Sequence, residues 1–404
     1  MEIFSGKKNG DGVIGSGGIV INGANEYGLK AQFQLKPESQ SQAPQCKHQV
    51  PQPKPQSLSK PQAQAVESAV HIPVLLKEAM DALDVRRGNV YVDGTLGGGG
   101  FSEAILKKLD GEGFLIGIDR DYSAVKNVSS KFETEFNTKN FKLFHLNFSS
   151  IDEAVKAAGF ENIDGVVLDL GISSIQLESN RGFSFNFNDG NEGNETSIKA
   201  ANPNTASTFA SAETSAKEGG EKIYPEATID MRMDAGDENG LTAYDVVNGY
   251  PEREIADILY KYGDEKFSRR IAKSIVEYRS KNKPIETPSE LAGIVRKAVY
   301  RGYGKFKRFK TDPATKTFMA LRIFVNEEYD SLYKFLDKLD GILKKDGRAV
   351  IISFHSGEDR IVKNFLKNNL NFKPLNKKPI VPTAEEIENN PRSRSAKLRA
   401  FYRD

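Results

Sequence analysis

The fold is decided by one stretch of the chain, Asn89-Val90-Tyr91-Val92-Asp93-Gly94-Thr95-Leu96-Gly97-Gly98-Gly99-Gly100. The residues up to Asp93 are typical of a short buried strand, and the pattern from Phe101 to Leu109 predicts a helix. A glycine-rich turn between a strand and a helix lets the backbone approach a ligand closely and points helix N-terminal N–H groups at it. Glycine runs also occur in ordinary loops, and these glycines lack the dinucleotide-binding spacing, so the turn alone indicates only a candidate nucleotide site.

The rhythm of strands and helices continues around this stretch. Further strands are predicted at 113–119, 141–145, 163–170, 347–354 and 398–402. Helices are expected at 74–84, which is amphipathic, and at 123–136. Strands that alternate with helices indicate an α/β fold with a mostly parallel, doubly wound sheet that helices cover on both faces.

A helical insertion interrupts this domain, with helices expected at 250–262, 266–279 and 289–300. The tracts 36–64 and 189–227 are poor in large apolar side chains and cannot bury enough surface to fold. Short strands are expected at 19–21 and 31–35. The expected organisation is a disordered extension at 1–70, a first α/β part at 71–180, an inserted segment at 181–312 that holds the second polar tract and the helical domain, and a last α/β part at 313–404.

Cysteine and histidine are scarce in this chain. Cys46 is the only cysteine and the four histidines are scattered, so neither an internal disulfide nor a metal site is expected. The sequence has no run of 18 apolar residues and no secretory signal pattern at its start. We therefore expect a protein of the reducing cytoplasm with no membrane contact. The net charge of +2 leaves nucleic-acid binding to be judged from where the basic residues lie.

Two aspartates are expected at the same edge of the sheet. Asp119 ends the second strand, where doubly wound sheets place an acid that accepts hydrogen bonds from ribose hydroxyls. Nicotinamide enzymes and methyltransferases both use this arrangement. Asp169 ends the fourth strand and is followed by small polar residues that include Ser173. That pattern suits the orientation of an exocyclic amine for methyl transfer better than hydride transfer, for which no proton donor is evident.

Basic residues gather in two places. The segment 296–310 contains seven Lys or Arg residues, four aromatic residues and no acid, a mixture that supplies phosphate neutralisation and stacking surfaces for unpaired bases. A solvated charged surface is the alternative interpretation of both groups. The candidate RNA-binding residues are Lys305, Lys307, Arg308 and Lys310 in the first group and Arg392 and Arg394 in the second.

A series of motifs from residue 71 to the C-terminus resembles the RsmH (MraW) family, in the same order. They are His71-Ile72-Pro73-Val74-Leu75-Leu76, the Asp93-Gly94-Thr95 turn, Ile118-Asp119-Arg120-Asp121, Leu168-Asp169-Leu170-Gly171, Arg181-Gly182-Phe183-Ser184-Phe185, Asp230-Met231-Arg232-Met233-Asp234, Pro313-Ala314-Thr315-Lys316-Thr317-Phe318, Ser353-Phe354-His355-Ser356 and Asn390-Pro391-Arg392-Ser393-Arg394-Ser395. The family methylates N4 of a cytidine, cytosine 1402, in 16S ribosomal RNA. The resemblance implies a class I S-adenosylmethionine-dependent methyltransferase whose inserted helical domain helps to bind the cytidine, with the small ribosomal subunit as partner.

The resemblance also implies roles for individual residues. The expected contacts to S-adenosylmethionine are Gly99, Gly100 and Phe101 at its methionine part, Asp119 at the ribose, Phe148 beside the adenine, and Asp169 and Gln176. Transfer to an amine needs positioning and hydrogen bonds rather than a covalent nucleophile. For catalysis we expect Asp169 near the amine or the cofactor, with Ser173 and His355 as secondary candidates.

The chain departs from the family pattern at several positions. Phe101 replaces a usual histidine, Gly357 a usual leucine, Asp312 a usual histidine and Met319 a usual glutamine. Two alternatives therefore stay open at this point: a non-catalytic RNA-binding or assembly factor that keeps the fold, and a nicotinamide-dependent oxidoreductase. The oligomeric state also stays open, a homodimer included.

Overall fold

The computed structural model of the protein describes residues 20–21, 73–136, 138–173, 176–177, 181–183, 228–234, 236–237, 240–301, 309 and 311–404. The tract at 189–227, the strand expected at 31–35 and most of the extension expected at 1–70 lie outside these residues. Part of the strand expected at 19–21 is present as β1, Val20–Ile21.

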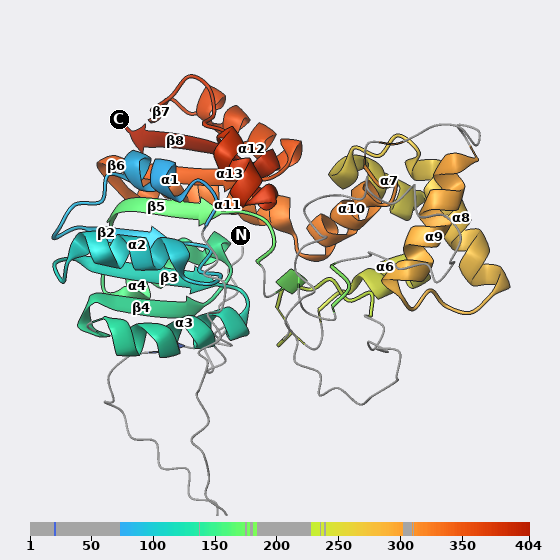
Figure 1. The fold of residues 1–404 in the computed structure, drawn as a ribbon, viewed down its shortest axis with the longest axis horizontal. Coiled ribbons are helices and arrows are strands. Elements are labelled where there is room, and N and C mark those ends of the chain that lie inside the picture. Colours follow the sequence, from blue (N-terminus) through green and yellow to red (C-terminus); the bar gives the residue numbers. More distant parts are fainter. Residues whose placement is uncertain are drawn as a thin grey trace, which may run out of the picture. The chain divides into compact units, whose positions relative to one another are not determined.

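Within the described ranges, a sheet of eight strands has the order β1-β4-β3-β2-β5-β6-β8-β7 (Figure 1). The strands from β4 to β6 are parallel, whereas β1 pairs antiparallel with β4, and β8 pairs antiparallel with both β6 and β7. The chain places β3 and β4 on one side of β2 and β5 and β6 on the other, which confirms the doubly wound α/β sheet expected from the sequence. The bounds are β2 (Val90–Asp93), β3 (Phe114–Asp119), β4 (Phe141–His145), β5 (Ile163–Asp169), β6 (Leu343–Ser353), β7 (Phe372–Pro374) and β8 (Lys397–Arg403).

Side chains along the strands alternate between two apolar cores, because successive residues of a strand point to opposite faces. Val92 and Ile116 belong to one core and their neighbours Tyr91 and Leu115 to the other. The first core is covered by α4 (Ile151–Ala158), α11 (Glu328–Ile342) and α12 (Ser356–Asn368). The second is covered by α1 (Leu76–Leu83), α2 (Gly100–Leu109) and α3 (Tyr122–Glu135), and Figure 1 shows α2 and α3 running in the direction of the strands.

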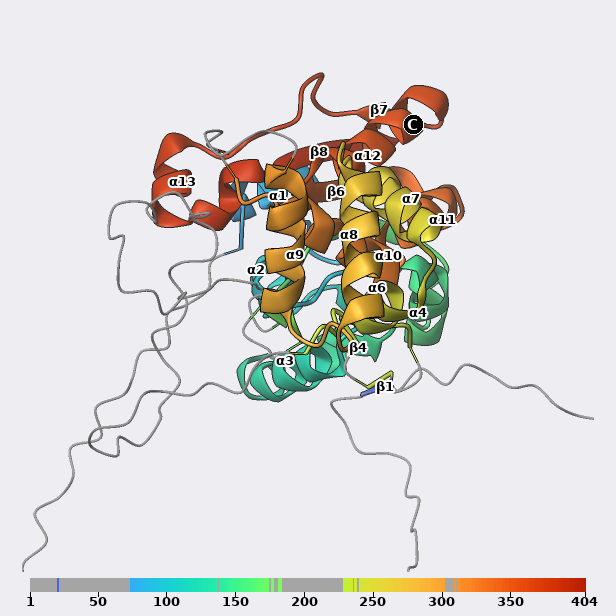
Figure 2. The same ribbon diagram turned by 90° about the vertical axis from the view of Figure 1, so that its right-hand side faces the viewer.

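A third apolar core belongs to the helices inserted between β5 and β6. These are α6 (Ala243–Gly249), α7 (Glu252–Gly263), α8 (Ser268–Lys281), α9 (Pro288–Tyr300) and α10 (Thr315–Val325), and Figure 2 shows α8 and α9 side by side. Two of the helices begin at strong caps. Thr242 and Asp245 form a capping box before α6, and the Thr287 side chain accepts the N–H of Glu290 before α9, whose first residue is Pro288.

Several elements differ from the sequence expectation. The helix expected at 250–262 begins only at Glu252, because Pro251 occupies its N-cap. β6 begins at Leu343 rather than at 347. The helices α4, α10, α11, α12 and α13 (Ala384–Asn389) and the strand β7 were not expected. Within the described part of the chain, every helix is too short or too polar to cross a lipid bilayer.

Candidate functional site

Three aspartates end three neighbouring parallel strands. Asp93 ends β2, Asp119 ends β3 and Asp169 ends β5. β2 lies between the other two strands, and its register pairs Asp93 with Gly117 on one side and Val167 on the other. The three carboxylates therefore meet at the carboxyl edge of the sheet, where the strand order reverses. This is the place where doubly wound folds bind ligands.

The glycine-rich turn after β2 has no room for a side chain at Gly94 or at Gly100. A Cβ atom at Gly94 would overlap Leu168, and one at Gly100 would overlap the ring of Pro73. Gly99 has a φ angle of +80° and is the N-cap of α2. The first N–H groups of α2 are thus presented at the edge that carries the aspartates, which suits an anionic ligand group.

Phe101, which stands where the family has histidine, points its side chain away from this edge. The side chain is 3% exposed and belongs to the core formed with α1 and α3. Its position leaves the backbone as the part of Phe101 that a ligand can contact.

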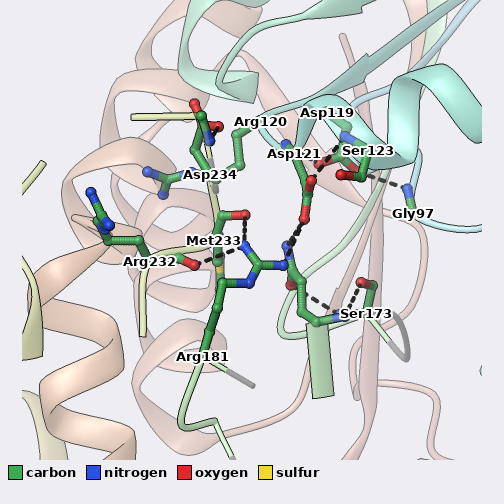
Figure 3. A network of polar contacts seen from close by, with 12 residues as sticks. Gly97, Asp119, Arg120, Asp121, Ser123, Ser173, Arg181, Arg232, Met233 and Asp234 are labelled. Carbon is green, nitrogen blue, oxygen red and sulfur yellow. Dashed lines mark hydrogen bonds and ion pairs between the residues drawn. The ribbon is translucent and has the colours of Figure 1, made fainter. Parts of the chain in front are cut away.

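Asp119 is held by two backbone N–H groups. Its Oδ2 accepts a hydrogen bond from Gly97 and its Oδ1 accepts one from Asp121, each at 2.8 Å (Figure 3). Burial raises the pKa of Asp119 to about 6, although both hydrogen bonds act in the opposite direction. Each carboxylate oxygen keeps a lone pair, so Asp119 can still accept hydrogen bonds from ligand hydroxyls.

Asp93 is buried and serves the turn itself. One of its oxygens accepts a hydrogen bond from Ser102 Oγ at 2.6 Å, and the other accepts the N–H of Thr95 at 3.2 Å. Burial raises the pKa of Asp93 to about 6, and the charge of Asp119 adds to this effect. Asp93 therefore ties the end of β2 to the first turn of α2.

Asp169 differs from the other two aspartates because one oxygen of its carboxylate is buried without a partner among the described residues. Its backbone N–H donates to Thr95 Oγ1 at 2.6 Å, but its Oδ1 is buried with no hydrogen-bond partner among the described residues. Burial is the main cause that raises the pKa of Asp169 well above its ordinary value, and the charges of Asp93 and Glu358 add to it. An unsatisfied buried carboxylate is costly to a folded protein and is typical of a group that serves a ligand.

Ser173 and Gln176 contact each other beside this edge. Gln176 Oε1 accepts the N–H of Ser173, and Ser173 Oγ accepts the N–H of Gln176, both at 3.2 Å. The Gln176 side chain also donates to Asp121 Oδ2 at 3.5 Å. Phe148 approaches the turn from another side, because its Cβ lies 3.4 Å from where a Cβ of Gly94 would stand. The expected cofactor residues thus lie around one sheet edge, and their roles stay predictions.

His355 caps α12. Its Nδ1 accepts the N–H of Glu358 at 3.5 Å, and its Nε2 lies 3.2 Å from Glu358 Oε1. Burial acts to raise the pKa of Glu358, but His355 and Arg322 outweigh it and the pKa lies below its ordinary value. Both ring nitrogens therefore face Glu358, and a part for His355 in catalysis stays a prediction.

Glu328, His355 and Glu358 each place one ligand atom within 4.8 Å of the others, a grouping that could hold a metal ion. Arg322 donates to both oxygens of Glu328 at 2.7 Å, however. The negative charge of this group is therefore balanced within the protein.

The side chain of Tyr329 occupies the space that a side chain at position 357 would need. A Cβ atom at Gly357 would overlap the Tyr329 hydroxyl and lie 2.6 Å from its Cζ atom. The leucine usual in the family cannot be accommodated while Tyr329 keeps this position. A cavity of about 230 Å³ opens here, and its lining includes Tyr262, Tyr329, Tyr333, Gly357, Arg360 and Asn364.

Of the candidate RNA-binding residues, the structure describes those of the second basic group but not those of the first. Lys305, Lys307, Arg308 and Lys310 lie outside the described residues. Arg392 and Arg394 lie in a short 3-10 helix, Pro391–Ser395, directly before β8. Because β8 pairs antiparallel with β6 and places Lys397 opposite Ser353, this helix lies at the same sheet edge as Asp169. Their binding to RNA stays a prediction.

Asp312 has a structural partner. Its Oδ2 accepts hydrogen bonds from Nε and Nη2 of Arg296 at 2.9 and 2.6 Å, and its Oδ1 accepts the N–H of Ala314 at 2.8 Å. One member of the first basic segment is therefore engaged within the protein.

Sequence reasoning assigned no individual role to Arg181, Glu358 or Tyr329. Arg181 pairs with Asp121, with Nη2 3.0 Å from Oδ2 (Figure 3). Glu358 could have been found, because a glutamate three residues after a capping residue is the capping-box pattern. Tyr329 gave no such signal, since its importance comes from contact with a helix that begins 27 residues later.

Comparisons with known proteins agree with this geometry. The model of the MraW methylase family matches residues 68–191 and 211–404. The chain is 41% identical over 350 residues to ribosomal RNA small subunit methyltransferase H of Caldicellulosiruptor bescii, covering 81% of this chain and 97% of that protein. It is 42% identical to the protein of the same name from Clostridium botulinum strain Kyoto and 38% identical to that of Clostridioides difficile, with the same shares covered.

The contact between Gly357 and Tyr329 predicts a coupled effect on stability. We expect Gly357→Ala to lower the free energy of unfolding by about 1–3 kcal/mol, because the methyl group overlaps the tyrosine. In a Tyr329→Leu background the same substitution should cost less than about 0.5 kcal/mol, since alanine is the better helix former. Urea unfolding of the four proteins measures this coupling. Gly293→Ala in α9, where a Cβ meets nothing within 4 Å, is the matched control and should not destabilise. An equal loss in the free energy of unfolding with and without Tyr329 would contradict the overlap between this tyrosine and a side chain at position 357.

The raised pKa of Asp169 predicts a stability effect that depends on pH. At a pH above about 4 the unfolded chain releases this proton freely, whereas the folded protein holds it, so stability falls as the pH rises toward the folded-state pKa. Asp169→Asn removes that loss and should raise Tm by roughly 1 to 3 °C at pH 8. The gain should shrink as the pH falls below about 4, because the unfolded state then becomes protonated as well. Thermal unfolding without cofactor tests this, with the exposed Asp337→Asn as control; a gain independent of pH would count against it.

Proposed function

The chain belongs to the MraW methylase family, and from this premise we propose that it transfers a methyl group from S-adenosylmethionine to N4 of a cytidine in 16S ribosomal RNA. In a class I methyltransferase fold we expect the cofactor to lie across the carboxyl ends of β2, β3 and β5. The relatives' names, which specify ribosomal RNA of the small subunit, support the choice of RNA. Because that RNA is cytoplasmic, we expect the activity in the cytoplasm.

The observation that carries the proposal is the Oδ1 atom of Asp169, which is buried without a hydrogen-bond partner among the described residues, at the sheet edge that also holds the glycine turn. Together with Asp93 and Asp119 it lines this edge with carboxyl oxygens that accept hydrogen bonds and that a nearby positive charge would help to ionise. S-adenosylmethionine carries a sulfonium, an ammonium and ribose hydroxyls, which are the positive and hydrogen-donating groups that such an edge favours. Its carboxylate suits the N–H groups at the start of α2. The residues present therefore fit this cofactor.

The chain's own residues would hold the cofactor in place and accept hydrogen bonds from the cofactor and from the cytosine amine. When bound, the cofactor supplies an electrophilic methyl group on a positively charged sulfur. Asp119 would accept the ribose hydroxyls, and the backbone from Gly99 to Phe101 would hold the methionine part. Asp169 would accept an N–H of the cytosine amine, which concentrates the nitrogen lone pair on the side that faces the methyl group.

Asp169 is also placed to take the proton that methyl transfer releases. As the new N–C bond forms and the C–S bond breaks, the amine becomes positive and must lose one proton. A raised pKa makes the Asp169 carboxylate a stronger proton acceptor than an ordinary aspartate. The target base must leave its stack to reach this edge, which is easiest from a single-stranded or irregularly paired site.

Methyl transfer to reconstituted small subunits tests the proposal. Subunits assembled from transcribed, unmodified 16S RNA are incubated with S-adenosylmethionine that carries a tritiated methyl group, and the RNA is digested to nucleosides. We expect the label to elute as N4-methylcytidine. Asp169→Asn should lower the rate by about 100-fold or more, because the amide cannot accept the proton. The exposed Asp337→Asn should leave the rate unchanged.

Other outcomes would select the alternatives. Binding of S-adenosylmethionine and of subunits without transfer would indicate a non-catalytic RNA-binding factor. Binding of NAD in place of S-adenosylmethionine would indicate an oxidoreductase. Label that elutes as another methylated nucleoside would retain the methyltransferase and overturn the choice of N4.

A further inference from the structure

Arg181 connects the carboxyl edge of the sheet, where the cofactor is expected, with the segment of chain that leads into the helical core. On the side of the sheet, its Nη2 donates to Asp121 Oδ2 at 3.0 Å, and Asp121 is only 2% exposed. The other oxygen of Asp121 caps α3 through the N–H of Ser123, and its backbone N–H donates to Asp119. A single residue, Asp121, therefore links Arg181 to Asp119, the expected ribose-binding acid (Figure 3).

On the other side, the same guanidinium holds residues 230–234, which we call the entry segment because they precede α6. Nη1 of Arg181 donates to the carbonyls of Arg232 at 3.0 Å and Met233 at 2.7 Å. The backbone carbonyl of Arg181 accepts the N–H of Met231 at 2.7 Å. Met231 has a φ angle of +60°, which is uncommon for a residue with a side chain, so the segment needs outside contacts to keep this shape.

Asn326, at the end of α10, closes the network. Its side chain accepts the N–H of Met233 at 2.8 Å and donates to the carbonyl of Met231 at 2.7 Å. Its own carbonyl accepts a hydrogen bond from Arg120 at 2.7 Å, and Arg120 lies between Asp119 and Asp121 in the chain. The entry segment is thus bound by Arg181 and Asn326, and each of these two residues also contacts the loop after β3, through Asp121 and Arg120 respectively.

We propose that Arg181 is a positioning residue for methyl transfer: by binding Asp121 and two carbonyls of the entry segment at once, it sets where the helical core holds the RNA relative to the cofactor. The planar guanidinium suits this task because its N–H groups point to several acceptors in fixed directions, which a lysine ammonium cannot reproduce. A small displacement of the target base away from the methyl group is sufficient to slow the reaction strongly. The inference rests on the proposed function for its kinetic part.

Arg181→Lys is the test variant, because it keeps the positive charge and removes the planar guanidinium with its several N–H donors. With reconstituted small subunits we expect kcat to fall by about 100-fold. The Kd of S-adenosylmethionine without RNA should stay within about threefold, since Asp119 and the glycine turn are unchanged. Asp121→Asn, which breaks the same contact from the other side and can still cap α3, should show the same division between kcat and Kd.

Arg279→Lys is the matched control. Arg279 also donates to two backbone carbonyls, those of Val247 and Tyr250, but both lie inside the helical core. Its loss should lower stability comparably and leave the kcat of the folded enzyme unchanged. If Arg279→Lys and Arg181→Lys reduce kcat alike, the role of Arg181 is only structural and the proposal is overturned. A parallel loss of kcat and cofactor binding in Arg181→Lys would overturn it as well.

Hydrogen exchange gives a readout that does not depend on turnover. The amides of Met231 and Met233 should exchange faster in Arg181→Lys than in the wild type, and they should be unaffected in Arg279→Lys. Unchanged exchange in Arg181→Lys would refute the positioning role even if the wild type proved inactive on RNA. A wild type without methyl transfer but with this exchange pattern would refute the proposed function alone.

Discussion

Three carboxylates held together at low exposure are the constraint on which the rest of the structure depends. Asp93 and Asp119 are compensated by hydrogen bonds from Ser102, Gly97 and the backbone of Asp121. Asp169 has no such compensation for its Oδ1 atom, and its raised pKa measures the cost. Proteins commonly retain a destabilising group of this kind where it contacts a ligand, because activity and stability then make opposite demands on the same residue.

The parallel register of β3, β2 and β5 creates this arrangement. Each strand ends in an aspartate, and parallel strands bring their carboxyl ends to the same edge. The turn after β2 must then pass close to Leu168, which excludes a side chain at Gly94. The antiparallel strand β8 adds residues from the far end of the chain, because its start lies opposite the end of β6. One edge therefore gathers the expected cofactor residues and the candidate RNA contacts Arg392 and Arg394.

The helical insertion leaves the sheet directly after the last of these aspartates. The chain departs after β5, builds its own apolar core and returns through α10 and α11 to β6. Arg181 marks the departure and Asn326 the return, and both bind the entry segment beside Asp121. The insertion is thus anchored beside Asp121 and Asp119, at the carboxyl edge of the sheet, rather than at a remote surface. Such an anchor gives the part that is expected to hold RNA a defined place relative to the cofactor.

The sequence by itself determined the α/β class, the glycine turn, the strands that end in Asp119 and Asp169, and the helical character of the insertion. These depend on local patterns: buried strands read as apolar runs, and helices repeat every three or four residues. α11 was missed although Leu332, Phe335, Leu336 and Leu339 follow that spacing. The tertiary structure alone decided which carboxylate oxygen is buried without a partner, that Tyr329 occupies the space beside Gly357, and that Arg181 reaches Asp121, 60 residues before it. These facts arise from contacts between segments far apart in the chain, and a local pattern carries no information about such contacts.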